Sequence, residues 1–280
     1  MVDTKSSTSF AYQHEKEYES VADQQNVHQR VNDVKTIRSG VEENEVITAN
    51  DWNRRWEMNQ ASRWQLAGVH PFLLQYASFF RDWHNRANKS ILVPLCGKSD
   101  DLLWLTQECG LRHVIGIESS VIAITSLLKE YEYTQVNEKI GCYTGFNGKL
   151  SIFCADFFDE NVNQSLLGGP VDYIWDRAAL VALHWNDHER YVKKLLNLQA
   201  TPKEEQNGKF DILISAYWHS QHRGPPFGVE LQYLRQVFGV DITVEQLDEV
   251  NAFYSGWMNG GFTEMFERFY GVQLPTRDIS

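Results

Sequence analysis

The chain has 280 residues, a formal net charge of −11, 42% hydrophobic residues and 13% aromatic residues. This apolar content is enough for a sizeable core and excludes a chain that is disordered throughout. The acidic balance, without a dense Lys/Arg cluster, argues against a protein that binds nucleic-acid phosphates, so small-molecule chemistry fits better.

The start of the chain is polar, which excludes a secretory signal. No run approaches the roughly 20 apolar residues that a membrane helix needs. The cysteines form neither a CxxC pair nor a metal-ligand pattern, and we expect buried free thiols and no metal. We therefore expect an intracellular, cytoplasmic protein without a membrane partner. The four cysteines are Cys96, Cys109, Cys142 and Cys154.

Residues 1–46 are rich in Ser, Gln, Asn, Glu and Lys and show little apolar periodicity. Such a segment cannot bury enough surface to offset its ordering entropy, so we expect a disordered tail. Residues 47–280 are expected to form a single domain. Its first helix is predicted by Thr48-x-x-Asp51, which resembles a capping box.

Two further patterns predict helical structure near the start of the domain. Trp52 and Trp56 are spaced to share one face of the first helix. His70-Pro71 opens a longer helix, because proline is favoured at the first helical position. The apolar face of this second helix would comprise Phe72, Tyr76, Phe79, Phe80 and Trp83.

From residue 90 onward, short apolar strands alternate with helices. This alternation predicts a mostly parallel sheet that is buried on both faces by helices. Asn147-Gly148 predicts a two-residue hairpin turn. The last two strands are expected to pair as a closing antiparallel hairpin. The expected strands are 91–96, 113–118, 149–154, 171–175, 210–217, 242–250 and 262–270, and the expected helices are 100–108, 121–131, 188–198 and 230–238.

The carboxyl ends of these strands are the place where open α/β sheets bind ligands. The loop Gly97-Lys98-Ser99 is not a phosphate-binding P-loop, because position 92, where that motif needs glycine, is leucine. It also lacks the GxGxxG pattern of dinucleotide-binding proteins. These absences favour a cofactor that has a ribose and an adenine but no phosphate, and S-adenosylmethionine fits.

Two acidic residues are placed to bind such a cofactor. Glu118 ends the second strand, where a carboxylate can accept both ribose hydroxyls, and the alternative is an exposed acid at a strand end. Asp156 follows the third strand and could accept from the adenine amino group, with Phe157 beside the ring. The alternative for this pair is a turn aspartate next to a core phenylalanine.

Several strings resemble the thiopurine S-methyltransferase family. Pro94-Leu95-Cys96-Gly97-Lys98-Ser99-x-Asp101-Leu102 resembles the cofactor loop of that family, and the paired Trp52 and Trp56 also match. The resemblance runs in order from about Thr48 to Tyr270. The other matching strings are Val114-x-Gly116-x-Glu118-x-Ser120, Ile174-Trp175-Asp176-Arg177-x-Ala179-Leu180-Val181-Ala182 and Gly224-Pro225-Pro226-Phe227.

The resemblance implies a Rossmann-like class I methyltransferase fold, with a mostly parallel seven-stranded sheet and a C-terminal antiparallel hairpin. It implies S-adenosylmethionine as cofactor, S-adenosylhomocysteine as product, a small-molecule methyl acceptor and a monomer. Arg177 matches the arginine that reaches the acceptor, and the alternative is a salt bridge with Asp176 or with the helix that follows. His222 occupies the family position before the Pro-Pro loop but equally fits a surface loop. The residues expected to bind the cofactor are Trp56, Trp64, Leu95, Gly97, Glu118, Asp156, Phe157 and Arg177.

Two departures from the family fall on the acceptor side. The animal family members have a second arginine where this chain has Gly256. The Tyr-Asp pair that precedes the Pro-Pro loop is Tyr217-Trp218 here. Both changes leave the physiological acceptor open.

Methyl transfer from a sulfonium to a thiolate needs chiefly positioning, so no Ser-His-Asp arrangement is required. A free thiol has a pKa near 8.5, and Arg177 could increase the thiolate fraction by pairing with the anion. His219 is a second candidate for assisting deprotonation. Two alternatives to a thiol methyltransferase remain: methylation of halide or hydrosulfide ions, and a catalytically silent protein that only binds the cofactor.

Overall fold

The computed structural model describes residues 47–61, 64, 65, 67–81, 86–129, 133–137, 141–200, 210–221 and 223–275, and the structural statements below concern these residues. The expected tail, residues 1–46, lies outside them, as do Trp83 and His222. The boundary between tail and domain therefore stays a prediction.

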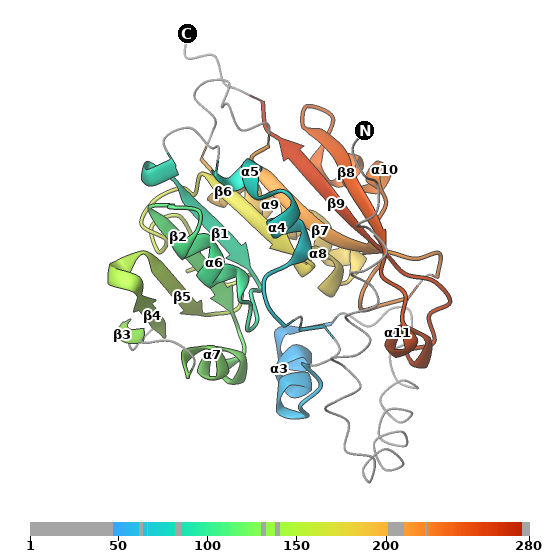
Figure 1. Cartoon of the computed structure of the whole chain (residues 1–280), viewed down its shortest axis with the longest axis horizontal. Coiled ribbons are helices and arrows are strands. Elements are labelled where there is room, and N and C mark those ends of the chain that lie inside the picture. The colour runs from blue at the N-terminus through green and yellow to red at the C-terminus, as the bar shows by residue number, and fades with distance from the viewer. Residues whose placement is uncertain are drawn as a thin grey trace, which may run out of the picture. The chain divides into compact units, whose positions relative to one another are not determined.

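The strands of the described residues form one mixed sheet (Figure 1). They are β1 (Ser90–Pro94), β2 (His113–Glu118), β3 (Tyr133–Asn137), β4 (Cys142–Gly145), β5 (Leu150–Cys154), β6 (Tyr173–Arg177), β7 (Ile212–Trp218), β8 (Thr243–Asn251) and β9 (Phe266–Gln273). The order across the sheet is β3-β4-β5-β2-β1-β6-β7-β9-β8. From β5 to β7 all neighbours are parallel, and β9 runs antiparallel to both β7 and β8. The predicted parallel sheet with a closing antiparallel hairpin is confirmed.

The expected number of seven strands was too low, because β3 and β4 extend the sheet beyond β5. β4 pairs antiparallel with β5, and β3 pairs antiparallel with β4. Asn147 and Gly148 lie in the connection from β4 to β5, and both have positive φ. The expected two-residue turn was too short, because Gly145 pairs with Leu150 and residues 146–149 lie between the strands. The sequence of β3, Tyr-Thr-Gln-Val-Asn, has no apolar run and so gave no strand signal.

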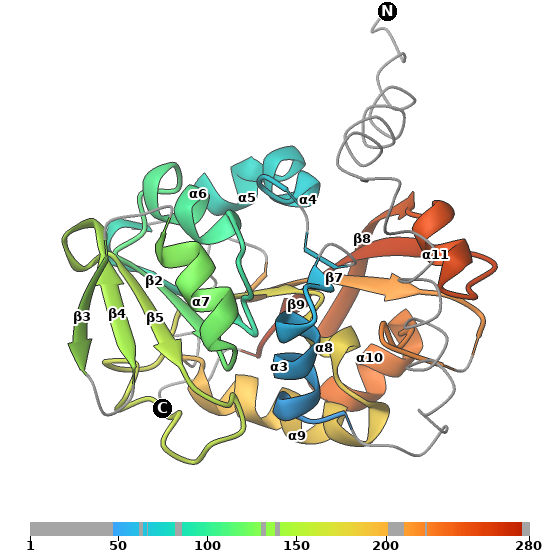
Figure 2. The same cartoon turned by 90° about the horizontal axis from the view of Figure 1, so that it is seen from below.

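Helices cover both faces of the sheet. They are α3 (Ala49–Glu57), α4 (Pro71–Gln75), α5 (Ala77–Arg81), α6 (Asp101–Gln107), α7 (Val121–Leu128), α8 (Ala179–Ala182), α9 (Trp185–Leu198), α10 (Leu231–Phe238) and α11 (Ser255–Asn259). Figure 2 shows α4 to α7 on one face and α8 to α10 on the other. The predicted capping box of α3 is present, since the Thr48 and Asp51 side chains each accept a hydrogen bond from the other residue's backbone N–H.

Alternating residues of the central strands fill two separate cores. Ile91 and Val93 of β1 belong to the cluster beneath α4, α6 and α7, whereas Leu92 belongs to the cluster beneath α9 and α10. All three side chains are fully buried. A strand that is apolar on both faces is what a parallel sheet between two helical layers requires.

The long helix predicted from His70 is broken at Tyr76, which separates α4 from α5 (φ −103°, ψ 27°). Tertiary contacts fix this residue: its hydroxyl donates to Asp248 at 2.8 Å, and its ring lies 4.9 Å from that of Phe269. α9 also begins earlier than predicted, at Trp185, because His184 caps it by accepting from the Asn186 N–H. β9 begins at Phe266 rather than at 262, and α8 and α11 were not expected.

Candidate active site

The loop after β1 adopts a conformation that requires glycine. Gly97 has φ +55°, and a Cβ at this position would lie 3.1 Å from the Gln65 side-chain oxygen and 3.5 Å from the Trp56 ring. Leu95, two residues earlier, also has positive φ, at 45°. This conformation brings the backbone of the loop close to Trp56 and to Glu118, which ends the neighbouring strand.

Glu118 is a buried carboxylate held mainly by backbone donors. One oxygen accepts from the Gly97 N–H at 2.9 Å and the other from the Ser120 N–H at 2.7 Å. The side chain is only 7% exposed, so it is not the exposed strand-end acid of the alternative interpretation. Burial raises the pKa of Glu118, and the backbone hydrogen bonds partly offset that effect. Ser119 also contributes a backbone and a side-chain hydrogen bond, so a ribose hydroxyl would share the acceptor sites of the carboxylate with these donors.

The two predicted tryptophans lie together beside this loop. The Trp64 ring packs edge-on against Trp56 at 5.8 Å and against Trp52 at 5.2 Å. Gln65, the next residue, binds the loop directly: its amide donates to the carbonyl of Lys98, and its oxygen accepts from the Lys98 N–H at 3.3 Å. Gln65 was not singled out, because nothing in the sequence marks this contact across 33 positions.

Arg177 ends β6 at the same edge of the sheet and does not pair with Asp176. Its Nη2 donates to the carbonyl of Trp64 at 3.4 Å, and its Nε lies 4.0 Å from a carboxylate oxygen of Asp101. The side chain is 12% exposed. The expected salt-bridge alternative therefore named the wrong acid.

Asp176 instead has a structural role on the other face of β6. Its carboxylate accepts from the Ala179 N–H at 2.7 Å, which holds the first turn of α8, and from the Tyr191 hydroxyl at 2.8 Å. Burial raises the pKa of Asp176 to about 6 against these hydrogen bonds. The Asp176 side chain thus points away from the site, because successive side chains of a strand point to opposite faces of the sheet.

The two residues expected at the adenine lie after β5. Asp156 is exposed, and one of its oxygens accepts from the Phe158 N–H at 2.9 Å. Phe157 is 2% exposed and packs 5.3 Å from the Tyr191 ring in the core. These contacts are those of the turn aspartate and core phenylalanine of the alternative interpretation. A role at the adenine stays a prediction for both residues.

Aromatic side chains gather beyond the end of β7, where the acceptor was expected. The Trp257 ring lies 5.4 Å from Tyr217, 5.7 Å from Tyr254 and 5.7 Å from Phe262. Gly256 is required by this packing, since a Cβ there would lie 2.3 Å from the Tyr254 ring. An arginine could not replace this glycine without displacing Tyr254.

His219 packs at the edge of this aromatic cluster. Its Nε2 donates to the carbonyl of Pro226 at 2.9 Å, which leaves Nδ1 as the unprotonated nitrogen. Burial lowers the pKa of His219, so the ring is neutral at neutral pH. Its ring lies 4.7 Å from Phe262 and is 5% exposed. His219 as a base stays a prediction.

The site therefore contains the loop around Gly97, the buried carboxylate of Glu118, the packed rings of Trp56 and Trp64, and the guanidinium of Arg177. The carboxylate and the close-approaching loop fit a ribose-containing cofactor that carries no phosphate. No group of three or more His, Cys, Asp or Glu side chains in the described residues could hold a metal ion. No helix among them is long and apolar enough to cross a membrane. All four cysteines are free, and Cys154 is only partly buried.

This sheet with its strand-end site defines a class I methyltransferase fold. A solved S-adenosylmethionine-dependent methyltransferase from Anabaena variabilis ATCC 29413 superposes with a TM-score of 0.55 at 12% identity, covering 83% of this chain and 98% of that chain. Residues 47–274 match the thiopurine S-methyltransferase family. The sequence is 34% identical to the thiopurine S-methyltransferase of Photobacterium profundum, over 76% of this chain and 93% of the relative. It is 30% identical to the Mus musculus enzyme, over 82% of this chain and 93% of the relative.

The chain belongs to the thiopurine S-methyltransferase family of S-adenosylmethionine-dependent methyltransferases. The resemblance that the sequence strings indicated is thereby confirmed.

Proposed function

We propose that this protein transfers the methyl group of S-adenosylmethionine to the sulfur of a small thiol or thiopurine-like acceptor, giving S-adenosylhomocysteine, without a metal. The observation that carries the proposal is the position of Arg177. Its partly exposed guanidinium lies beside the packed rings of Trp56 and Trp64 and beside the loop around Gly97. A cation at this edge can hold an acceptor anion next to the cofactor. We expect a cytoplasmic monomer.

The residues around the loop would hold the cofactor. Glu118 would accept from the ribose hydroxyls alongside the hydrogen bonds that it receives from Gly97 and Ser120. Trp56 and Trp64 would cover it on one side, together with Leu95. Asp156 and Phe157 would lie at the adenine, where the exposed carboxylate of Asp156 is the available acceptor.

S-adenosylmethionine supplies a methyl carbon that is already activated by the positive sulfonium. The methyl group would pass to the acceptor sulfur, S-adenosylhomocysteine would be left, and the thiol proton would pass to water. Arg177 stabilises the thiolate, which is the reactive form of the acceptor, by charge pairing. Holding the sulfur in line with the breaking bond contributes several kcal/mol.

The test is a product screen with methyl-labelled cofactor against small thiols, thiopurines, hydrosulfide and iodide. We expect methylated thiols, and Arg177→Lys should reduce kcat/KM for them while leaving cofactor affinity within about 0.5 kcal/mol. Arg112→Lys is the matched control, because Arg112 directly precedes β2 and so lies at the amino end of that strand, whereas the site lies at the carboxyl ends. Methylation of iodide alone would favour the halide alternative, and cofactor binding without any product would favour a silent protein. Unchanged thiol kinetics in Arg177→Lys would remove Arg177 from the mechanism.

A further inference from the structure

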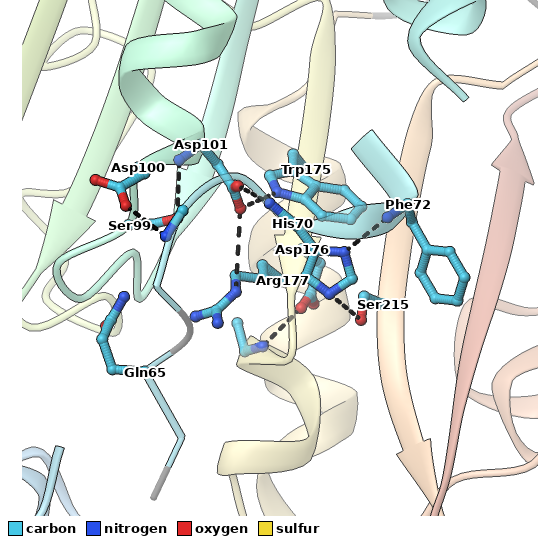
Figure 3. A network of polar contacts seen from close by, with 12 residues as sticks. Gln65, His70, Phe72, Ser99, Asp100, Asp101, Trp175, Asp176, Arg177 and Ser215 are labelled. Atoms are coloured by element: carbon cyan, nitrogen blue, oxygen red, sulfur yellow. Dashed lines mark hydrogen bonds and ion pairs between the residues drawn. The ribbon is translucent and has the colours of Figure 1, made fainter. Parts of the chain in front are cut away.

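A buried carboxylate, Asp101, joins the loop after β1 to the arginine at the end of β6 (Figure 3). Asp101 begins α6 and is 1% exposed. One of its oxygens accepts from the backbone N–H of His70 at 2.7 Å, and the other accepts from the indole N–H of Trp175 at 3.0 Å. The second oxygen also lies 4.0 Å from Nε of Arg177. Three segments that are distant in sequence thus meet at one carboxylate.

A second carboxylate, Glu267 of β9, lies behind this group. One oxygen of Glu267 accepts from the His70 ring at 2.8 Å and from the Ser215 hydroxyl. Burial by itself would raise the pKa of Glu267, but His70, Ser215 and Arg177 outweigh it, and the net shift is downward. Glu267 is therefore ionised at neutral pH. Asp101 of α6 faces the Arg177 Nε, and Arg177 in turn contributes to the lowered pKa of Glu267 in β9.

The contacts of Arg177 leave most of its hydrogen-bonding capacity unused. A guanidinium has five N–H groups. Asp101 faces Nε from 4.0 Å, which is beyond hydrogen-bond length, and the Trp64 carbonyl takes one N–H of Nη2 at 3.4 Å. Both Asp101 oxygens already accept from neutral donors. The ion pair therefore orients the guanidinium through its Nε–H, and Trp64 takes one N–H of Nη2. The other three N–H groups have no hydrogen-bond acceptor among the described residues and stay available to a bound anion.

We propose that Asp101 is a positioning residue for methyl transfer: it fixes the Arg177 guanidinium relative to the cofactor loop. Asp101 follows that loop directly, and its backbone N–H donates to Ser99 within it at 3.2 Å. A shift of the loop is thus transmitted to the arginine. This inference rests on the proposed function, because it concerns the same arginine. Displacing a positioned group by about 1 Å can cost on the order of 10²-fold in rate.

The first test is a double-mutant cycle of Asp101→Asn and Arg177→Lys, read as kcat and KM for a thiol acceptor. Asp101→Asn removes the charge and also leaves one of the two N–H donors of Asp101, from His70 or Trp175, facing an amide NH₂ group. We expect kcat/KM to fall about tenfold or more, mainly in kcat. In the Arg177→Lys background the same change should cost less than about twofold, because there is no planar guanidinium left to position. An equal factor in both backgrounds would overturn the proposal.

Trp175→Phe is the matched control for general damage to the cluster. It removes the indole N–H from the same Asp101 oxygen and loosens the core, but it keeps the carboxylate and the arginine. We expect it to lower the unfolding midpoint with a smaller loss of kcat/KM than Asp101→Asn. If Trp175→Phe reduced kcat/KM as much as Asp101→Asn at similar stability, Asp101 would have only a structural role.

A second readout does not depend on methyl transfer. Phenylglyoxal labels arginines, and peptide mass spectrometry gives the labelling rate of Arg177, with Arg112 and Arg235 as internal standards. We expect Asp101→Asn to raise the Arg177 rate several-fold and to leave the standards unchanged. An unchanged Arg177 rate would overturn the positioning role.

The same labelling separates the two proposals from each other. An Arg177 rate that rises in a protein that methylates no thiol would contradict only the proposed function. If Asp101→Asn does not fold, Asp101→Glu replaces it in both experiments. It keeps the charge but moves the carboxylate by one methylene. The kcat/KM factors in the two backgrounds and the Arg177 labelling rate then support or overturn the positioning role as before.

Discussion

The carboxylate of Glu118 both stabilises the fold and is expected to bind the cofactor. Glu118→Gln is therefore the most informative substitution. Glutamine keeps the shape but offers one acceptor oxygen where the structure has two. The N–H groups of Gly97 and Ser120 each need such an oxygen, at 2.9 and 2.7 Å. One of them would face the new amide NH₂ group instead.

The cost follows from that count of donors. A buried donor left without an acceptor costs about 1–3 kcal/mol. With a urea m-value of roughly 2–3 kcal/mol per M, the unfolding midpoint should fall by roughly 0.3–1.5 M. Cofactor affinity should also fall by about 1.5–3 kcal/mol, because a charge-assisted hydrogen bond to the ribose is lost.

Urea unfolding with and without S-adenosylmethionine, together with calorimetric titration, separates the two effects. Glu108→Gln is the control, since Glu108 carries the same charge on the exposed end of α6. An unchanged midpoint in Glu118→Gln would show that the two backbone donors do not depend on the carboxylate. Unchanged cofactor affinity in a folded variant would remove Glu118 from the binding site.

Three further results are expected. Leu195→Ala, at a fully buried position of α9, should lower the free energy of unfolding by about 2–5 kcal/mol in urea denaturation. Burial lowers the pKa of His188 from 6.5 to about 4, so the folded state disfavours its protonation, and stability should be lost as pH falls from 6.5 towards 4. His188→Gln should flatten that part of a pH series of urea midpoints, and an unchanged slope would contradict the assignment. Gly256→Ala should displace the Tyr254 ring and change thiol KM more than cofactor affinity, whereas equal effects on both would place Gly256 outside the acceptor site.

The sequence alone predicted the features that depend on neighbouring residues. The capping box at Thr48 and Asp51 formed as expected, because its hydrogen bonds are local. A turn also forms at Asn147-Gly148, but in a four-residue loop rather than the expected two-residue one. The alternation of apolar strands with helices predicted the layers, because a strand that is buried on both faces must be apolar throughout. The strings around Gly97 and Arg177 indicated the family that the comparisons confirmed.

The tertiary structure alone decided the contacts between distant segments. Gln65 reaches Lys98 across 33 positions, and Asp101 meets Trp175 across 74, with no local pattern to mark either pair. Tyr76 breaks a helix that its periodicity favours, because its ring and hydroxyl are held by the last two strands. Arg177 pairs with Asp101 rather than with its neighbour in sequence, because successive side chains of a strand point to opposite faces of the sheet.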